Sequence, residues 1–199
     1  TLQHHDLVRE HLGPRERRAL GLAHVPEDRL RMGVVSNFSA EDNAILGYHD
    51  RAECTRGGWL DRAAIRKACE GKMAAHDVRP PLPTLRISAF SGGNQQKVVI
   101  AKWLARNPKV VVLDEPTSAL DMTVQVQIVD LLRDLQRKYG LAYLFISHDL
   151  NVVRAMSHQI LVMRAGDIVE SGPAEALFTA PKTEYTRALL AAALDPTGN

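Results

Sequence analysis

The sequence has few of the residues that mark specialised classes of protein. Only two of its 199 residues are cysteine, and 5% are aromatic. Because Cys54 and Cys69 do not form a closely spaced metal-binding pair, we interpret them as reduced thiols of a cytosolic protein. The longest apolar runs, such as residues 110–113, are far too short to cross a bilayer, and the first residues show no signal-peptide pattern.

There is also little net charge. The 25 basic and 23 acidic residues leave a formal charge of +2. Nucleic-acid binding calls for a basic stripe, so we predict that nucleic acid is not a partner. Hydrophobic residues make up 45% of the chain and charged residues 24%, as in ordinary globular proteins. This length suits one domain, or one domain with a small lobe.

The middle of the chain alternates between strand and helix patterns. Residues 109–114 form a continuous apolar run that predicts a strand buried on both faces. Residues 123–138 have the spacing of an amphipathic helix, and 141–147 predict the next buried strand. Strand–helix–strand alternation of this kind predicts an α/β fold with a parallel sheet and right-handed crossovers.

The segments before this region have a different pattern. Residues 21–25 predict a short buried strand, and Ser39 with Asp42 resembles a capping box that opens a helix. Residues 61–75 have apolar side chains at helical spacing. Residues 35–105 are therefore expected to be mainly helical and to form a separate lobe.

The end of the chain predicts a hairpin followed by helices. A short helix is expected from about Leu150, and a hairpin should turn at residues 165–167. Helical patterns then cover 173–179 and about 183–194.

Two acids, Asp114 and Glu115, follow directly on the first buried strand. The carboxyl ends of strands are where open α/β sheets bind ligands. Because successive side chains point in opposite directions, one acid can face Mg²⁺ while the other faces a water, as metal-assisted phosphoryl transfer requires. A strand end with solvated acids is the alternative.

The stretch FSGGNQQK places two glycines directly before a predicted helix over 92–104. Glycine lets the backbone approach a ligand closely, and the exposed N–H groups of a helix N-terminus attract anions. An ordinary capped helix start explains the same residues.

Two further positions follow the predicted strands. His148 closes the second buried strand, where it could donate a hydrogen bond to a phosphate or a water, or be purely structural. Asp121 is placed to cap the helix that follows it, a role compatible with a second one.

In combination, these motifs resemble the ATP-binding-cassette (ABC) ATPase family over residues 88–172. The order of motifs is SGGNQ at 91–95, DEPT at 114–117, SALD at 118–121 and SHD at 147–149. The resemblance implies a P-loop NTPase-like parallel sheet core with a helical subdomain. It also implies that the cofactors are ATP and Mg²⁺.

The resemblance assigns a role to each motif. Asp114 is similar to the Walker B carboxylate near Mg²⁺, Glu115 to the general base, and His148 to the switch histidine. The signature motif, which binds the γ-phosphate of ATP held by an opposing subunit, is matched by Ser91, Gly92, Gly93, Asn94 and Gln95. The D-loop, which crosses the dimer interface, is matched by the segment from Ser118 to Asp121.

The sequence departs from the family pattern in two places. It contains no Walker A loop, G-x-x-x-x-G-K-[ST], whose amides and lysine cradle the phosphates. Glu27 stands about where the family often has the glutamine of the Q-loop, and an acid there would repel phosphate. We therefore interpret the chain as the C-terminal portion of a nucleotide-binding domain. We expect very weak ATP binding, little hydrolysis by the chain alone, and an uncovered strand edge.

On this interpretation the chain has three parts. Residues 1–34 are a remnant of the ATP-binding core with the glutamine-loop strand, and 35–105 are the helical signature subdomain. Residues 106–199 hold the Walker B, D-loop and switch-histidine core and the C-terminal helices. Residues 35–85 would contact a membrane subunit.

The resemblance to transporters is mixed. VPEDR and GNQQKVVIAKWL resemble the second cassette of sugar and nucleoside importers, whereas residues 117–194 resemble peptide-importer cassettes. The implied function is to power a membrane importer from the inner face of the cell membrane. The implied partners are a second nucleotide-binding domain and integral membrane permease subunits. A soluble non-transport ABC-type ATPase and a non-catalytic dimerising remnant are the alternatives.

Overall fold

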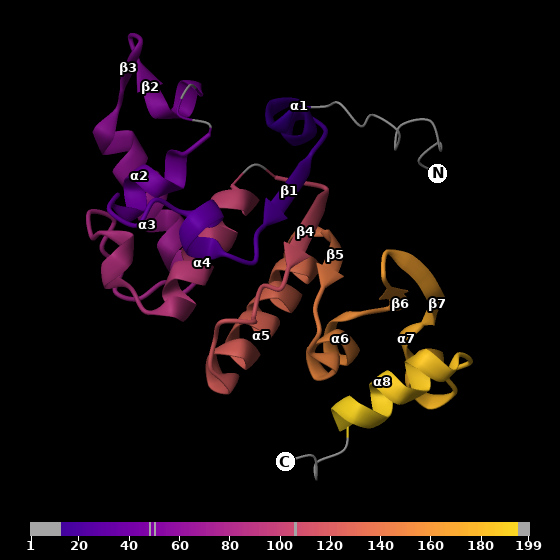
Figure 1. The fold of residues 1–199 in the computed structure, drawn as a ribbon. Coiled ribbons are helices and arrows are strands. Elements are labelled where there is room, and N and C mark those ends of the chain that lie inside the picture. Colours follow the sequence, from indigo (N-terminus) through magenta and orange to yellow (C-terminus); the bar gives the residue numbers. More distant parts are fainter. Residues whose placement is uncertain (1–12, 48, 50, 106, 195–199) are drawn as a thin grey trace. The chain divides into compact units, whose positions relative to one another are not determined.

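The computed structural model describes residues 13–47, 49, 51–105 and 107–194 (Figure 1). The chain divides into two compact units, Thr1–Leu144 and Phe145–Asn199. The elements of the first unit are α1 (Pro14–Ala19), β1 (Leu22–Val25), η2 (Arg29–Gly33), α2 (Ala40–Ile45), η3 (Ala52–Cys54), β2 (Thr55–Arg56), β3 (Trp59–Leu60), α3 (Arg62–Ala75), η4 (Ile87–Ala89), α4 (Gly92–Leu104), β4 (Val110–Asp114) and α5 (Met122–Tyr139). β5 (Ala142–Ile146) crosses the division, and the second unit holds α6 (Leu150–Met156), β6 (Gln159–Arg164), β7 (Asp167–Pro173), α7 (Ala174–Thr179) and α8 (Glu184–Leu194).

The central sheet has the strand order β1-β4-β5. β1 and β4 are parallel, with Leu22 opposite Val110 and Val25 opposite Leu113. The carboxyl ends of these two strands therefore lie at the same edge of the sheet. The predicted α/β fold with a parallel sheet core is confirmed.

The expectations that β4 is buried on both faces and that β5 is a buried strand are wrong. In β4, Val111 and Leu113 are buried on one face, while the alternate residues are only half-buried. In β5, Leu144 is 50% exposed and Ile146 is 46% exposed, because β5 lies at the end of the strand order with an open face. An apolar run shows that a strand is apolar, but not how many layers cover it.

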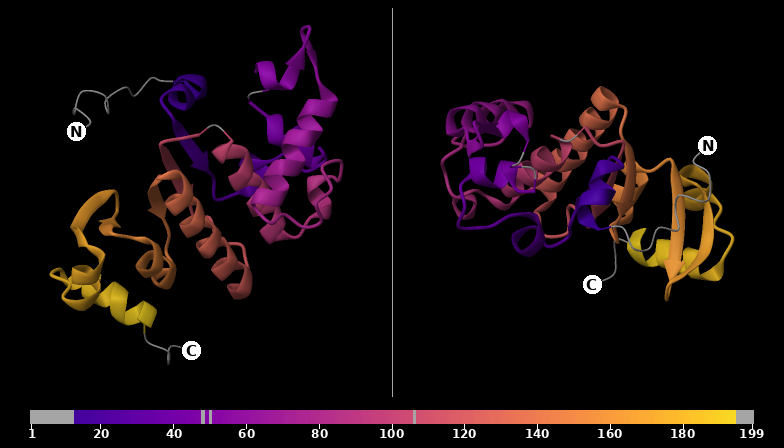
Figure 2. Two further views of the ribbon diagram at one scale, coloured as in Figure 1. Left: turned by 180° about the vertical axis from the view of Figure 1, so that it is seen from behind. Right: turned by 90° about the horizontal axis from the view of Figure 1, so that it is seen from above.

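Helix α4 is the centre of the helical part of the first unit. It contacts β1 and η2 on one side, α2 and α3 on another, and α5 (Figures 1 and 2). Eight consecutive residues of α4 are buried, from Gln95 to Lys102, and four of these are apolar, from Val98 to Ala101. A helix that is buried on all sides is one that other elements surround.

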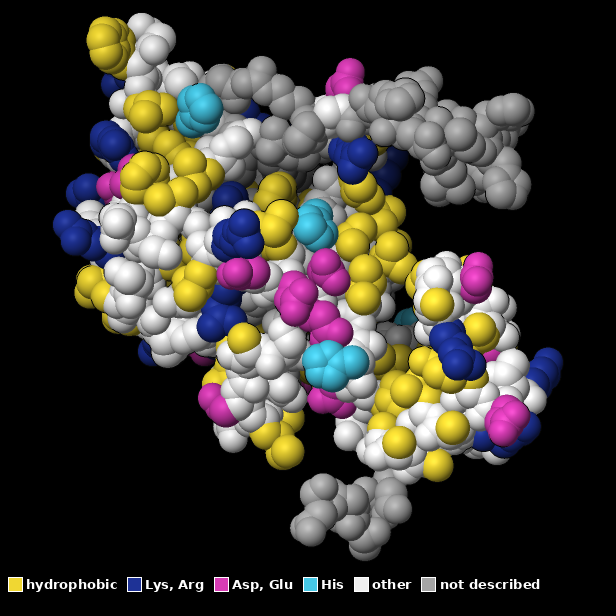
Figure 3. All heavy atoms as spheres, viewed as in Figure 1, with side chains coloured by type: hydrophobic (Ala, Val, Ile, Leu, Met, Phe, Trp, Pro, Cys, Tyr) yellow, Lys and Arg dark blue, Asp and Glu magenta, His cyan; other side chains and the backbone are white. Residues whose placement is uncertain are grey.

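The segment 35–105 is mainly helical, with one exception, and it lies within the first unit. Ser39 caps α2 as predicted, because its Oγ accepts a hydrogen bond from the Asp42 N–H at 3.1 Å. The second bond of a capping box differs, since the Asp42 carboxylate accepts from the Ser39 hydroxyl at 2.6 Å and not from its backbone N–H. The exception is the short β2–β3 hairpin, which turns at two glycines with positive φ, Gly57 and Gly58. Hydrophobic side chains lie at its tip, where Trp59 is 82% exposed (Figure 3).

Helix α5 begins and ends as its sequence predicts. Asp121 Oδ1 accepts a hydrogen bond from the Val124 N–H at 2.9 Å, which caps the N-terminus. Gly140 has a φ of 61° and forms the left-handed cap at the other end. None of the helices in the described part of the chain combines the length and apolarity that a membrane span requires.

The second unit is an antiparallel hairpin with three helices. β6 and β7 pair through a turn at Ala165 and Gly166, both with positive φ. Its buried apolar residues come from α6, β6 and the helices that follow β7, and they are Val152, Val153, Met156, Val162, Ala174 and Leu177.

Glu170 on β7 holds the N-terminus of α8. Its carboxylate accepts hydrogen bonds from the Lys182 N–H at 2.8 Å and the Thr183 N–H at 3.0 Å. Hydrogen bonding by the Thr186 hydroxyl and then by these amides lowers the pKa of Glu170 from 4.5 to about 2. The carboxylate thus takes up the free amides that precede the helix.

We predict that this contact makes the second unit sensitive to acid. Because the pKa is lowered in the folded state, the stabilisation is complete above about pH 4.5 and is lost as the pH falls towards 2. Glu170→Gln should therefore lower the thermal midpoint at pH 7 and flatten its dependence on pH below 4.5. Circular dichroism melts from pH 2 to 7 measure this, with Glu175→Gln on α7 as the control. Parallel pH curves for wild type and Glu170→Gln would contradict it.

Candidate functional site

The candidate site begins where β4 ends. Asp114 is the last residue of β4, and its side chain is 38% exposed. Glu115 follows with a φ of 43°, in the left-handed region that non-glycine residues seldom adopt. The backbone therefore turns sharply between the two acids. Asp114 is half-exposed, whereas Glu115 is partly buried and its Oε2 atom is shielded from solvent. Acidic side chains gather on this face of the first unit around the end of β4 (Figure 3).

A histidine from the neighbouring strand joins the acids. His24 Nε2 on β1 lies 4.0 Å from Asp114 Oδ2, so the two form an ion pair whenever His24 is protonated. His24 belongs to none of the sequence motifs and was not among the predicted residues. The signal that could have found it is the parallel register, because His24 pairs with Val112, two residues before the acid.

The loop after the acids is held by its own hydrogen bonds. The Ser118 Oγ–H donates to the Glu115 carbonyl at 3.0 Å. Gln125 Nε2, on the second turn of α5, donates to the carbonyls of Thr117 at 3.1 Å and Leu120 at 3.3 Å. The segment predicted as the D-loop is therefore anchored at both ends, by Glu115 and by α5.

The signature residues form the start of α4. Ser91 is exposed and precedes Gly92, the first helical residue. Ser91 makes no cap hydrogen bond to the helix; its Oγ instead accepts from Asn94 Nδ2 at 2.9 Å. Asn94 Oδ1 accepts from the Arg79 N–H at 2.7 Å. The Ser91 side chain therefore leaves the amides at this helix end uncapped. Uncapped amides are what an anion-binding site at a helix N-terminus requires.

Close packing requires the glycine at 93, whereas the neighbour of Gly92 is the end of a flexible arginine side chain. A Cβ on Gly92 would lie 2.8 Å from Arg29 Nη2, and a Cβ on Gly93 would lie 2.5 Å from Val124 Cγ1 of α5. Neither glycine has a positive φ, so neither is needed for an unusual backbone conformation. The glycines allow Arg29 and α5 to approach the first turn of α4.

Gln95 is turned into the protein. It is 8% exposed, and its Nε2 donates to the carbonyls of Ile87 at 3.2 Å and Phe90 at 3.0 Å. Its Oε1 accepts from Arg29 Nε at 3.3 Å. The side chain of Gln95 thus ties the helix start to the segment before it, while Ser91 remains at the surface.

The remaining predicted residues lie in separate places. Glu27 is exposed in the bend after β1, and its carbonyl accepts from the Arg29 N–H at 3.1 Å. Glu27 comes two residues after the end of β1. Because β1 and β4 are parallel, Glu27 and Asp114 both lie near the carboxyl edge of the sheet. His148 is exposed in the second unit, just after β5.

The acids suit a magnesium ion that arrives with phosphates. Among the described residues there is no group of three or more histidine, cysteine, aspartate or glutamate side chains that could hold a metal by itself. Mg²⁺ typically binds one or two carboxylates together with waters and substrate phosphates. A single half-exposed carboxylate at a strand end, as Asp114 provides, fits that mode of binding.

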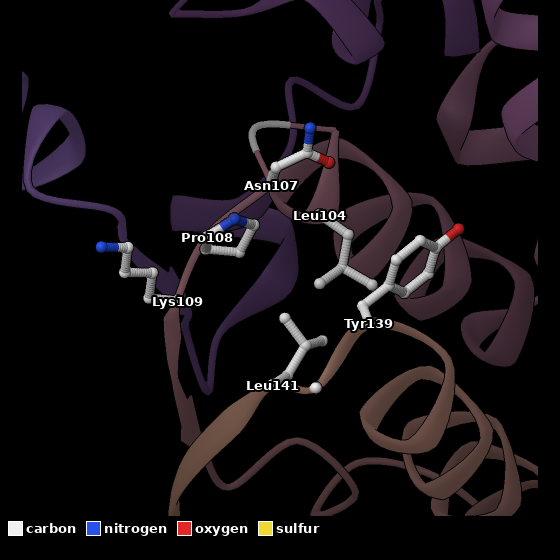
Figure 4. Close-up of a pocket in the computed structure, with 7 residues that line it drawn as sticks. Leu104, Asn107, Pro108, Lys109, Tyr139 and Leu141 are labelled. Atoms are coloured by element: carbon white, nitrogen blue, oxygen red, sulfur yellow. The ribbon is translucent and has the colours of Figure 1, made fainter.

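A hollow lies at the opposite end of the strands from the two acids. It has a volume of about 660 Å³ and is lined by Leu104, Asn107, Pro108, Lys109, Tyr139, Gly140 and Leu141. Figure 4 shows Leu104 and Leu141 facing the hollow, while the polar ends of Lys109 and Tyr139 point away from it. Since it adjoins the amino ends of β4 and β5, it is separate from the acids.

One protein-family model matches more than half of the chain. The model of the family described as ABC transporter matches residues 4–118, which is more than half of the chain. The chain belongs to the ABC transporter family. The resemblance drawn from the signature and strand-end motifs is thereby confirmed. The matched range contains the ABC signature residues and both acids, and it ends before His148.

Several curated ABC proteins are similar to part of this ABC chain. The peptidoglycan transport ATP-binding protein YejF of Agrobacterium fabrum is 60% identical over 106 residues, which are 53% of this chain and 19% of that protein. The oligopeptide transport ATP-binding protein OppD of Mycobacterium bovis is 54% identical over 54% of this chain and 18% of its own length. The glutathione import ATP-binding protein GsiA of Escherichia coli is 56% identical over 52% of this chain and 16% of its own length. The chain thus spans about a fifth or less of each of these proteins.

A solved ABC structure has a similar fold. It is the dimeric structure of a post-hydrolysis state of the ATP-binding cassette MJ0796 bound to ADP and Pi. The TM-score is 0.66 with 23% sequence identity, and the match covers 82% of this chain and 68% of that one. At this identity the comparison shows the fold of the ABC chain.

Proposed function

We propose that the chain is part of an ATP-binding and ATP-hydrolysing subunit that powers a membrane importer. The observation that carries the proposal is the pairing of strand-end acids with an open helix start in one unit of a family member. Asp114 ends β4 and Glu115 follows it, and the Ser91 side chain does not cap the N-terminus of α4. One acid of such a pair can bind Mg²⁺ while the other orients a water, and the N-terminus of a helix can bind a phosphate.

The residues divide the reaction between them. Bound Mg²⁺ would neutralise charge on the transferred phosphoryl group, with Asp114 as its protein ligand. Glu115 would orient the attacking water and accept its proton. Glu27 would stand at the Q-loop position of the cassette and His148 at its switch position.

The first turn of α4 would act across a dimer interface. Its residues, Ser91, Gly92, Gly93, Asn94 and Gln95, would bind the γ-phosphate of ATP held by a second nucleotide-binding domain. Ser118 and Asp121 would lie in the contact between the two domains. A dimeric cassette with ADP and Pi among the similar folds supports this arrangement.

The names of the relatives favour a peptide-like cargo. They mention peptidoglycan, oligopeptides and glutathione. We propose that the subunit acts on the cytoplasmic face of the membrane together with permease subunits. A soluble non-transport ATPase is less well supported, because the formal charge of +2 provides no basic stripe for nucleic acid.

We predict that the chain by itself binds MgATP weakly and hydrolyses it little. The sequence has no G-x-x-x-x-G-K-[ST] loop, which supplies the main phosphate contacts within one domain. Isothermal calorimetry with MgATP should show no micromolar affinity. Joining the chain behind a Walker A-containing segment of a related cassette should restore binding and turnover. Micromolar affinity of the chain alone would contradict the first expectation, and an inactive, folded fusion would contradict the proposed function.

A further inference from the structure

The η2 segment is fastened to α4 at two points. At one end of η2, Arg29 Nε donates to Gln95 Oε1, and at the other, Lys102 Nζ donates to the Gly33 carbonyl at 2.9 Å. Gly33 also packs against α4, since a Cβ there would lie 3.1 Å from Val99 Cγ2. η2 is a π-type turn, a conformation that is rare and frequent at functional sites. This segment therefore lies along α4 from its first turn to its last.

Arg29 completes the hydrogen bonding of the buried Gln95 amide. The Nε2 group of Gln95 already donates to two carbonyls of the preceding segment, those of Ile87 and Phe90. Its Oε1 accepts from Arg29, which lies 66 positions earlier in the chain. With both ends of the amide bonded, its orientation is set, and a buried acceptor is not left without a donor. The Phe90 carbonyl, one residue before Ser91, is held as a result.

The guanidinium of Arg29 also touches the turn directly. Its Nη2 lies where a side chain on Gly92 would stand, 2.8 Å from the position of a Cβ. Arg29 forms no ion pair with any carboxylate in the described part of the chain. Its Nε therefore donates to Gln95 while its Nη2 packs against Gly92, and the compact ammonium of lysine does not reproduce this planar arrangement.

We propose that Arg29 is a positioning residue for the SGGNQ turn. It fixes the Gln95 amide from one side and limits the movement of Gly92 from the other. The turn is then held in one orientation before a phosphate arrives. This inference rests on the proposed function, because only that function makes the SGGNQ turn a phosphate-binding site. Arg29 would then support this site from the distant η2 segment.

The test is an NMR titration of the ¹⁵N-labelled chain with inorganic tripolyphosphate. In wild type, the amide signals of Gly92 and Gly93 should shift as tripolyphosphate is added. In Arg29→Ala, the apparent affinity should fall about fivefold, the size of effect that loss of one hydrogen bond produces. Arg29→Lys should recover only part of it. Arg31→Ala is the matched control, because Arg31 is an exposed arginine of the same η2 segment.

A second readout needs no ligand and also covers variants that bind poorly. In the ligand-free spectra, Arg29→Ala and Arg29→Lys should move the amide signals of Phe90, Gly92 and Gly93 more than those at the far end of α4. Arg31→Ala should leave them in place. Wild-type affinity in Arg29→Ala, or unmoved signals at the turn, would overturn the role of Arg29. If tripolyphosphate does not shift the amide signals of the wild-type chain, the phosphate-binding role in the proposed function is wrong. The ligand-free spectra still decide whether Arg29 positions the turn.

Discussion

Glu115→Gln is expected to abolish ATP turnover in a cassette completed by joining this chain behind a Walker A-containing segment. Glutamine keeps the size of the side chain but cannot accept a proton from water. Loss of a general base costs about 10²–10⁴-fold in rate. MgATP binding should remain, because the phosphate contacts come from other residues. Steady-state phosphate release and equilibrium nucleotide binding measure the two effects.

The control is Asp134→Asn, which also removes one negative charge from the first unit. Asp134 lies on α5 in an exposed ion pair with Arg137, with 2.6 Å between Asp134 Oδ1 and Arg137 Nη2. Surface ion pairs of this kind contribute about 0–1 kcal/mol, so this variant should keep wild-type turnover. Equal rates for Glu115→Gln and wild type would remove Glu115 from the role of base. Loss of MgATP binding in Glu115→Gln would instead point to a structural role at its left-handed backbone position.

Gly93→Ala is expected to destabilise the chain by about 1–3 kcal/mol through overpacking of the contact between α4 and α5. The added methyl group would lie 2.5 Å from Val124 Cγ1, which is too close for either side chain. Valine has one strongly preferred rotamer in a helix, so Val124 cannot easily turn aside. Urea unfolding followed by circular dichroism gives the free energy of unfolding.

Two comparisons isolate the cause of that loss. Gly71→Ala, in the interior of α3, places its methyl group in open space and should stabilise the chain by about 0.5–1 kcal/mol. Combining Gly93→Ala with Val124→Ala should recover part of the lost stability, and a double-mutant cycle measures the coupling. If Gly93→Ala is as stable as wild type, the glycine serves the phosphate contact and not the packing.

Much of the candidate site could be predicted because its signals are local. A strand followed by Asp114 and Glu115, and a helix that starts after Ser91, depend on residues a few positions apart. The helix starts at Ser39 and Asp121 were predicted for the same reason, since a cap binds an amide within one turn.

Other features of the site could not be predicted from neighbouring residues. Arg29 meets Gln95 across 66 positions, and His24 meets Asp114 because two strands are parallel. The open face of β5 was also missed, because an apolar run is the same whether one layer or two cover it.

The sequence by itself determined the order of the motifs, the strand-end acids, the helix caps and membership of the ABC transporter family. Only the tertiary structure decided why Gly93 is small, because it faces Val124 of α5, and which distant residue, Arg29, lies against Gly92. The physical reason is the distance along the sequence over which each kind of interaction acts. Capping and hydrophobic period act within a few residues, whereas close packing depends on which distant segments the fold brings together.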